Sequence, residues 1–325
     1  MTPVWIDRAA KFLDVLLDLK RANTWVFRGQ ADSHWLLLPP ALRGSDFVNP
    51  MSRQRIVDLQ STAQLVEAEA MAVRGFLDIA VSAGLDVADD PVIHDALEGW
   101  TDLSARTATS DAWPPPQLLP ILCTAQRCGL PTRLLAFSTD PRVAIYHAAR
   151  EAAAWSCERQ FSNSVAPGVT HLSVWAIRGI SPSAGKDRDT GRFSLVRIES
   201  EAGTGTCYLA QRVTRSSLKD VINRRPWHLL LREAPDLADL DLGVEQLCLP
   251  IEEAPELLQL LSQVGFNAAT IFRSPHSIVD AMREIGYRRA SAHKGFVPPS
   301  GAESLYAGGT ETWGMNPIVG SSASR

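Results

Sequence analysis

The sequence predicts an α+β fold in which mixed, mainly antiparallel sheets are flanked by helices. Three observations predict it: apolar residues recur at helical spacing near both ends, short β-branched and aromatic segments lie between them, and a long helical stretch interrupts these segments. The 325 residues suffice for one elaborated domain or two average ones. With 36 acidic and 32 basic residues, the net charge of −4 argues against a protein that grips long duplex nucleic acid through bulk electrostatics.

The first predicted elements are a helix and a short strand. A Thr-Pro pair at residues 2–3 supplies an N-cap and a first-turn proline, and apolar residues then recur at helical spacing to about residue 20. Residues 24–28 are rich in β-branched and aromatic side chains and precede a glycine, which predicts a strand. Strand alternation places Arg28 at its end, on the same face as Val26.

Residues 44–120 are predicted to form a helical insertion. Apolar residues from Ile56 to Leu77 follow helical spacing, and the segment Trp-Pro-Pro-Pro at 113–116 closes the region.

Strands and helices follow the insertion. A strand is predicted at 133–137, and Thr139 or Asp140 can cap a helix that begins at Pro141. Further strands are predicted at 171–177, 193–199, 206–213, 245–251 and 267–272, with a hairpin turn at Gly203-Thr-Gly205.

Two helices and a tail end the chain. Helices are predicted from Pro255 to Val264 and from Ser274 to Ile285, each closed by the glycine that follows. Residues 297–325 are rich in glycine and serine without an apolar period, which predicts a flexible tail.

Several classes of protein are disfavoured. Charged residues interrupt the apolar ones in the first thirty residues, and no stretch of about 18 uncharged apolar residues occurs, so we expect a cytoplasmic protein with no membrane partner. Cys123 and Cys128 have no second cysteine pair or histidine pair nearby, so we expect no metal site. Serine-hydrolase, Walker A and Rossmann motifs are missing from the sequence.

The densest cluster of candidate functional residues is Trp-Val-Phe-Arg-Gly-Gln at 25–30, followed by Trp-Leu-Leu-Leu-Pro at 35–39 and Arg43. A second string, Gly-Leu-Pro-Thr-Arg-Leu-Leu, occupies 129–135. Together these strings resemble the FRG domain family, which is named for the Phe-Arg-Gly triplet. The resemblance covers most of residues 10–285 apart from the insertion.

Because the matching strings lie on both sides of the insertion, the resemblance implies one domain at residues 1–296. Two departures from the family pattern matter. Arg127 replaces the family's histidine, and Ala136 replaces its aspartate. If either family side chain is catalytic, this protein is impaired or altered.

A more distant resemblance, to arginine-dependent ADP-ribosyltransferases, implies a fold, a reaction and NAD as the substrate. Those enzymes begin with an aromatic-Arg-Gly strand, continue with a Ser-Thr-Ser strand and a helix, and end with a glutamate-containing strand. The corresponding residues here are Phe27-Arg28-Gly29, Phe137-Ser138-Thr139 and Gln211.

The resemblance assigns a role to each site residue. Arg28, with Gly29 and Gln30, would hold the NAD phosphate or ribose, since a fixed guanidinium can bind a phosphate in a bidentate manner. Ser138 and Thr139 would support the nicotinamide end. Arg43 and Arg133 would be second-tier phosphate-binding or structural groups.

The reacting ribose needs a carboxylate, because cleavage passes through an oxocarbenium-like state. Gln211 would face this ribose but carries no charge, and the position two residues later is Val213. Glu199, Glu201 and Glu245 are the candidate substitutes on or beside neighbouring strands.

Each candidate also has a structural interpretation. Arg28 could be a buried arginine with a structural partner, Arg133 could anchor a loop, and Ser138 or Thr139 could simply cap a helix. His147 on an apolar helix face is typical of a core residue. Trp25 and Trp35 are typical of core residues, with Trp35 alternatively lining a binding site.

Two functions therefore stay open. The first is an NAD-dependent ADP-ribosyltransferase-like protein, a bacterial toxin or anti-phage effector that modifies a macromolecular acceptor, protein or nucleic acid. The alternative is a non-catalytic ligand-sensing or interaction module that keeps the binding site and has lost the chemistry.

Overall fold

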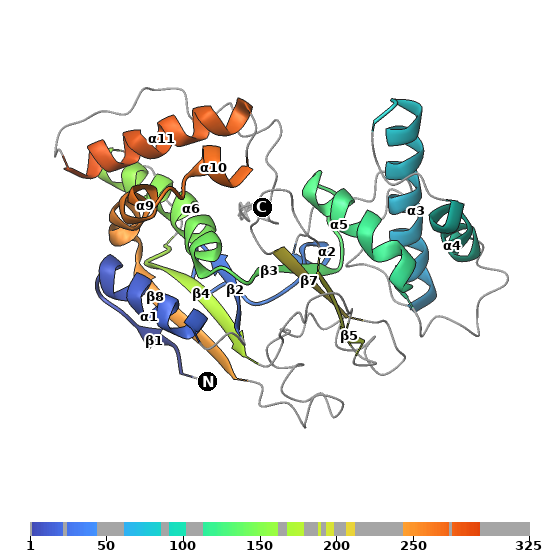
Figure 1. Cartoon of the computed structure of the whole chain (residues 1–325), viewed down its shortest axis with the longest axis horizontal. Helices are drawn as coiled ribbons and strands as arrows, with labels where there is room; N and C mark the ends of the chain where they lie inside the picture. The colour runs from blue at the N-terminus through green and yellow to red at the C-terminus, as the bar shows by residue number, and fades with distance from the viewer. Residues whose placement is uncertain are drawn as a thin grey trace, which may run out of the picture.

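A computed structural model describes residues 2–21, 25–43, 62–85, 91–101, 113–161, 168–178, 188–189, 193–197, 206–211, 243–272 and 275–292 (Figure 1). These residues include an eight-stranded sheet with the order β1-β8-β4-β2-β3-β7-β6-β5. β1 and β8 are parallel, and the other recorded pairs are antiparallel. The predicted α+β class and mixed, mainly antiparallel sheet are confirmed.

Six of the eight strands agree closely with those expected, β1 and β5 were not predicted, and the strand expected at 267–272 is not formed. The strands are β1 (Val4–Trp5), β2 (Trp25–Gln30), β3 (Leu134–Ser138), β4 (His171–Arg178), β5 (Arg188–Asp189), β6 (Phe193–Arg197), β7 (Thr206–Gln211) and β8 (Val244–Pro250). β2 continues through Gly29 to Gln30 instead of ending at Arg28. β6 and β7 are antiparallel neighbours, as the predicted hairpin requires, although its turn at 203–205 lies outside the described residues.

Helices surround the sheet. They are α1 (Ala9–Arg21), α2 (Pro40–Arg43), α3 (Thr62–Ser82), α4 (Pro91–Thr101), α5 (Leu119–Arg127), α6 (Pro141–Phe161), α9 (Ala254–Gln263), α10 (Ala268–Phe272) and α11 (Pro275–Ala292). Within the described ranges, none of them combines the length and apolar character needed to cross a membrane. The predicted tail at 297–325 is not among the described residues.

The start of the first helix was predicted wrongly. Val4 and Trp5 form the edge strand β1 beside β8, and the Ile6 N–H donates to the Cys248 carbonyl at 2.9 Å. The helix begins at Ala9, whose N–H donates to the Glu253 carboxylate at 2.9 Å. The carboxylate of the distant Glu253 therefore caps the helix in place of the local Thr-Pro pair. The residues that follow this pair form a strand, so they cannot begin the helix.

The strand predicted at 267–272 is also wrong, since Ala268–Phe272 form the short helix α10. The Asn267 side chain accepts a hydrogen bond from the Thr270 N–H at 3.1 Å, which is a helix cap. This cap, and burial of Ile271, outweigh the β-branched character of the segment.

The last two helices were predicted correctly at their beginnings. α9 ends before Gly265, which has a positive φ of 82°. α11 begins at Pro275 but continues through Gly286 to Ala292, so Gly286 does not close it. Tyr287, which packs against the main core, lies beyond this glycine, so packing rather than local propensity extends the helix.

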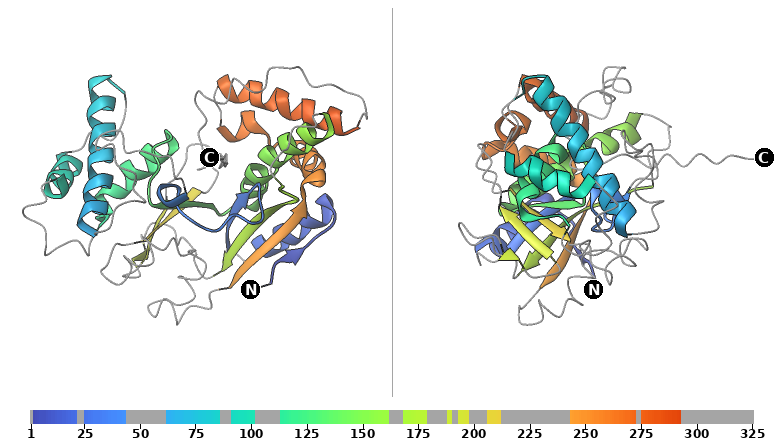
Figure 2. Two further views of the ribbon diagram at one scale, coloured as in Figure 1. Left: turned by 180° about the vertical axis from the view of Figure 1, so that it is seen from behind. Right: turned by 90° about the vertical axis from the view of Figure 1, so that its right-hand side faces the viewer.

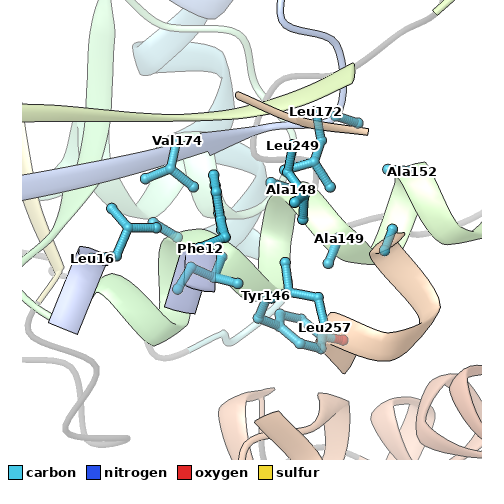
Figure 3. Packing of buried hydrophobic residues seen from close by; sticks show 14 of the residues in the cluster. Phe12, Leu16, Tyr146, Ala148, Ala149, Ala152, Leu172, Val174, Leu249 and Leu257 are labelled. Atoms are coloured by element: carbon cyan, nitrogen blue, oxygen red, sulfur yellow. The ribbon is translucent and has the colours of Figure 1, made fainter. Parts of the chain in front are cut away.

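The main hydrophobic core lies between one face of the sheet and the helices α1, α6 and α9 (Figure 3). Phe12 of α1, Val174 of β4 and Leu257 of α9 are members of this cluster. The side chains that α6 presents to the core are mostly alanines, namely Ala144, Ala148, Ala149, Ala152 and Ala153. Small side chains allow this helix to approach the sheet closely.

A second hydrophobic cluster belongs to the helical insertion. It joins Leu77 of α3 and Leu97 of α4 to Leu122 of α5, and it reaches the sheet through Leu134 and Ala136 of β3. The insertion lies at one end of the long axis of the molecule, away from α11 (Figures 1 and 2). Trp113, expected as part of a helix-breaking segment, is fully buried in this cluster.

Gly29 is the point of closest approach between β2 and α6. A Cβ atom at this position would lie 1.8 Å from the carbonyl oxygen of Ala144 and 2.9 Å from the backbone nitrogen of Ala148. Both obstacles are backbone atoms of a helix that is packed on both sides. A glycine is therefore required here by packing.

We expect Gly29→Ala to lower the free energy of unfolding by about 3 kcal/mol or more, because helix and strand must separate to admit the methyl group. Urea denaturation followed by circular dichroism measures this. Gly286→Ala is the matched control, since a Cβ there meets no atom within 4 Å. The control should be neutral or slightly stabilising, and equal losses in both variants would contradict the packing argument.

Candidate functional site

The candidate site is the face of the sheet opposite the main core. Phe27 pairs with Ala176 and belongs to the core cluster, so its neighbours Arg28 and Gln30 project to the other face. Arg28 is paired with Trp175 and Gln30 with Ser173.

The neighbouring strand β8 extends this set, because Trp175 is paired with Gln246. We call Arg28, Gln30, Ser173, Trp175 and Gln246 the polar face. All five are buried, at 6% exposure or less. A buried row of polar side chains on three adjacent strands is unusual, since such groups need partners to offset their desolvation.

Two amides of the polar face connect the strands to the segment that follows β2. Gln30 accepts a hydrogen bond from the Trp175 indole N–H at 2.8 Å and donates to the Leu36 carbonyl at 3.3 Å. Gln246 donates to the Ser33 carbonyl at 2.6 Å. The segment 31–39 is therefore held at the polar face by its own backbone carbonyls.

Arg28 lies beside β3. Its Nη1 donates to the Ala136 carbonyl at 2.8 Å, and the residue is 1% exposed. The Arg28 side chain thus has a structural role, which is to link β2 to β3. Within the described residues these two strands share one backbone pair, Phe27 with Ser138, so the additional link matters.

The Ser173 hydroxyl differs from the two amides of the polar face. Its Oγ is buried and has no hydrogen-bond partner within the described part of the chain. A buried hydroxyl without a partner costs free energy on the order of 1–3 kcal/mol. Ser173 lies between Gln30 and Cys248 of the adjacent strands. A bound ligand that supplied a hydrogen-bond partner to its hydroxyl would remove this cost.

Ser138, predicted to be catalytic, projects to the opposite face from Arg28. It is paired with Phe27, so the two side chains lie on the core side of the sheet. Its Oγ accepts a hydrogen bond from the Asp140 N–H at 2.9 Å. The alternative interpretation gave Ser138 a structural role as the helix cap. The geometry supports a structural role, but in the turn before α6, since the cap itself is Asp140. Thr139 follows it, half-buried, in the same turn.

Asp140, one of the two predicted caps, is the N-cap of α6. Its carboxylate accepts the Arg142 N–H at 3.0 Å and also contacts the side chains of Arg142 and Lys20. Burial alone would raise the pKa of Asp140, but the hydrogen bonds from Arg142 and Lys20 outweigh it and hold the pKa below its ordinary value. Asp140 is therefore a charged structural group.

Gln211 lies at the far end of β3 from Ser138. In the β3–β7 ladder Ser138 is opposite Thr206 and Leu134 is opposite Ala210, so Gln211 follows beyond Leu134. Five residues of strand correspond to roughly 16 Å. The backbone register therefore separates two residues that were predicted to belong to one catalytic site.

Arg133 belongs to a buried ion pair. Its Nε donates to the Glu69 carboxylate at 2.7 Å, with a second contact through Nη2. The Trp113 indole N–H donates to the same oxygen at 2.8 Å. Arg133 and Glu69 are both 5% exposed, so this group fastens α3 to the beginning of β3.

The other predicted site residues are placed as follows. Gly29 faces α6 and meets the packing requirement described above. Arg43 ends α2, and its side chain lies outside the described part, as do the side chains of Arg127 and Gln211. Glu199 and Glu201 also lie outside it. Glu245 is opposite Ala176 and so lies on the core side of β8.

Three ionisable residues lie between α6 and the C-terminal helices: Tyr146 and Glu284 are buried, and His147 is half-buried. The Tyr146 hydroxyl donates to the Glu284 carboxylate at 2.5 Å. Burial raises the pKa of Tyr146 and of Glu284. Burial, followed by the positive charges of Arg150 and Arg28, lowers the pKa of His147 to about 3. His147 is therefore a neutral packing residue at physiological pH, in contact with the Phe272 ring.

The two tryptophans of the motif are packing residues. Trp25 is 8% exposed in the main core, and Trp35 meets Trp155 of α6 edge to face, with ring centroids 6.0 Å apart. Within the described ranges, no group of three or more histidine, cysteine, aspartate or glutamate residues is arranged to bind a metal ion.

No protein-family model, curated protein or solved structure matches the chain. The FRG and ADP-ribosyltransferase resemblances therefore stay predictions. The site must be judged by its own chemistry.

The sequence interpretation missed Ser173, Trp175 and Gln246. A signal for them exists, because they are polar or hydrogen-bonding residues that alternate with apolar residues in the interior of two strands. Glu69 was also missed, and its signal is weaker, since one acidic residue on a helix is usually exposed.

We expect Glu69→Ala to lower the free energy of unfolding by about 3–5 kcal/mol, because it leaves Arg133 buried without its carboxylate. Chemical denaturation measures this. The double variant Glu69→Leu with Arg133→Met should lose less than Glu69→Ala, because it buries no charge. The pair of Arg74 with Asp78, which is exposed, provides the control, and Asp78→Ala should cost less than about 1 kcal/mol.

We expect His147 to make the fold less stable in acid. Its folded pKa of about 3 lies below the value of about 6.5 in an unfolded chain, so between these values only the unfolded state takes up the proton. Stability should therefore fall by about 1.4 kcal/mol per pH unit as pH decreases below 6. Urea unfolding of wild type and His147→Gln from pH 7 to pH 4 tests this.

The slope due to His147 is the difference between wild type and His147→Gln, since other carboxylates titrate in both. His276→Gln, at an exposed histidine, serves as the control and should keep the wild-type profile. Identical pH profiles for wild type and His147→Gln would contradict a histidine that stays neutral in the folded state.

Proposed function

We propose that this protein is a ligand-sensing module of the FRG type that binds an NAD-like dinucleotide at the polar face and does not transfer its ADP-ribose. One observation carries the choice between the two functions: Ser138 projects to the opposite side of the sheet from Arg28, and Gln211 lies beyond the other end of β3. The three groups that the transferase interpretation requires do not converge.

The polar face supports binding. It combines a guanidinium, two carboxamides, an indole N–H and the Ser173 hydroxyl, which has no partner in the described part. Phosphate and ribose oxygens are acceptors that such donors recognise. The choice of a dinucleotide comes from the family resemblance, and the donors on the polar face are compatible with it.

The charges of the face also favour binding over catalysis. The side chains that β2, β4 and β8 contribute to it within the described part include no carboxylate, since Glu245 projects to the core side. A carboxylate is the group that would stabilise an oxocarbenium-like transition state. A site with donors and no such carboxylate holds its ligand without cleaving it.

An ADP-ribosyltransferase-like toxin or anti-phage effector is the second candidate. The order of strands favours it, because β2, β3 and β7 are adjacent, as the arginine, serine and glutamate strands would be in that class. In this function Glu199 or Glu201 would supply the carboxylate, and a protein or nucleic acid would be the acceptor.

We expect NAD and ADP-ribose, but not nicotinamide alone, to raise the melting temperature of the full chain, because a ligand that binds only the folded state stabilises it. Ser173→Ala should weaken NAD binding by about tenfold or less, through loss of one neutral hydrogen bond. Titration calorimetry measures the affinity.

The matched control is Ser156→Ala, a buried serine on α6 away from the polar face, which should bind as the wild type does. Gln30→Leu removes both hydrogen bonds of that side chain and should abolish the rise in melting temperature caused by NAD. The melting temperature of this variant without ligand shows that it is folded. If neither NAD nor ADP-ribose binds the folded wild type, the proposal is wrong.

Incubation with labelled NAD and cell lysate separates the two functions. The sensing module binds NAD without releasing nicotinamide or labelling an acceptor. If the wild type transfers label to an acceptor, and Glu199→Gln or Glu201→Gln abolishes this transfer, the protein is a transferase instead.

A further inference from the structure

The outward side of α11 is an exposed apolar stripe. Ile278, Val279, Met282 and Ile285 are 57%, 50%, 65% and 41% exposed. Their spacing of one, three and four residues places them on one side of the helix. The other side holds Ser277 and Glu284, which are both buried, and Glu284 bonds to Tyr146 of α6 and to Ala268 of α10. The stripe therefore faces away from the domain.

The helix that carries this stripe is basic. Within α11 three arginines, at 283, 288 and 289, stand against two acidic residues. Both acidic residues have partners within the domain: Asp280 contacts Arg150 and Arg283, and Glu284 accepts from Tyr146. Arg289 is exposed in the last turn of the helix. The α11 surface thus combines an apolar stripe with positive charge.

The tip of the α3–α4 pair has the opposite charge. Ile79, Leu85 and Val92 are 67%, 62% and 54% exposed at the end of α3 and the start of α4. From residue 75 to residue 98 the sequence has six acidic residues and no lysine or arginine. Of these, Asp95 and Glu98 are exposed in α4, and Asp78 is exposed in α3, where it pairs with Arg74 at 3.7 Å. We call this surface the acidic tip.

The exposure of Leu85 is notable because of its backbone position. Gly84 has a φ of 67°, its N–H donates to Val81, and the Leu85 N–H donates to Ala80, which is a Schellman ending. In this motif the residue after the glycine usually packs back on its helix. Here it is left in solvent, so the acidic tip presents an apolar side chain on a rigid backbone.

We propose that the α11 surface of one copy of this chain binds the acidic tip of another, so that molecules associate head to tail. The two surfaces match in apolar character and are opposite in charge, which is the pattern of electrostatic complementarity at interfaces. They lie at opposite ends of the molecule (Figures 1 and 2), so they cannot meet within one chain. A heterologous contact of this kind leaves a free surface at each end and extends into oligomers.

Other occupants fit less well. Two α11 surfaces facing each other would bring like charges together, and so would two acidic tips. Nucleic acid or an anionic membrane would be attracted to α11 but repelled by the acidic tip, and would leave the tip unexplained. The surfaces are small, so the association should be weak, with a dissociation constant on the order of 10 µM.

Sedimentation velocity of the full chain tests this proposal. Between about 1 and 200 µM the wild type should form dimers and larger oligomers, and about 0.5 M salt should shift it toward monomer. Met282→Glu on α11 and Asp95→Lys on α4 should each weaken association about tenfold or more. Both positions are exposed, so both variants should keep the wild-type melting temperature.

Mixing the two variants gives the decisive result. Each keeps one intact surface, so an equimolar mixture should form a one-to-one dimer and nothing larger. Val264→Glu is the control, at an apolar residue 57% exposed outside both surfaces, and should associate as the wild type does. A wild type that is monomeric throughout, or an Asp95→Lys variant that associates unchanged while Met282→Glu does not, would overturn head-to-tail binding.

Discussion

The close approach of α6 to β2 at Gly29 is the constraint on which the rest of the structure depends. The Ala144 carbonyl occupies the space that a side chain at residue 29 would need, and alanines line the helix along the sheet. Since α6 also contacts α1 and α9, its depth against the sheet sets the thickness of the main core. With the apolar interior on this side, the polar side chains of the central strands project to the other side.

The Phe-Arg-Gly-Gln motif is largely explained by this arrangement. Phe27 fills the core, Arg28 links β2 to a carbonyl of β3, Gly29 admits the helix, and Gln30 joins Trp175 to the segment that follows the strand. Each residue has a structural reason before any ligand is considered. A ligand would use hydrogen-bonding capacity that this framework leaves unused, and the buried Ser173 hydroxyl, which has no partner within the described part, is the clearest such group.

The helical insertion is held to the sheet in a different way. Glu69 accepts hydrogen bonds from both Arg133 and Trp113, so one carboxylate links α3 to the segments on either side of α5. The apolar cluster around it also includes Leu134 of β3. This anchorage presents the acidic tip at a distance from α11, and it explains how one chain can carry two complementary surfaces that do not meet.

The sequence by itself determined the elements whose signals are local. Pro141 with its preceding cap, the alternation of Val26 and Arg28, and Gly265 after α9 were predicted correctly, because capping and strand periodicity act within a few residues. Tertiary structure decided the rest. Strand pairing turned Val4 and Trp5 into β1, and packing carried α11 past Gly286. The register of β3 with β2 and β7 separated Ser138 and Gln211 from the places predicted for them, since register depends on partners far away in the chain.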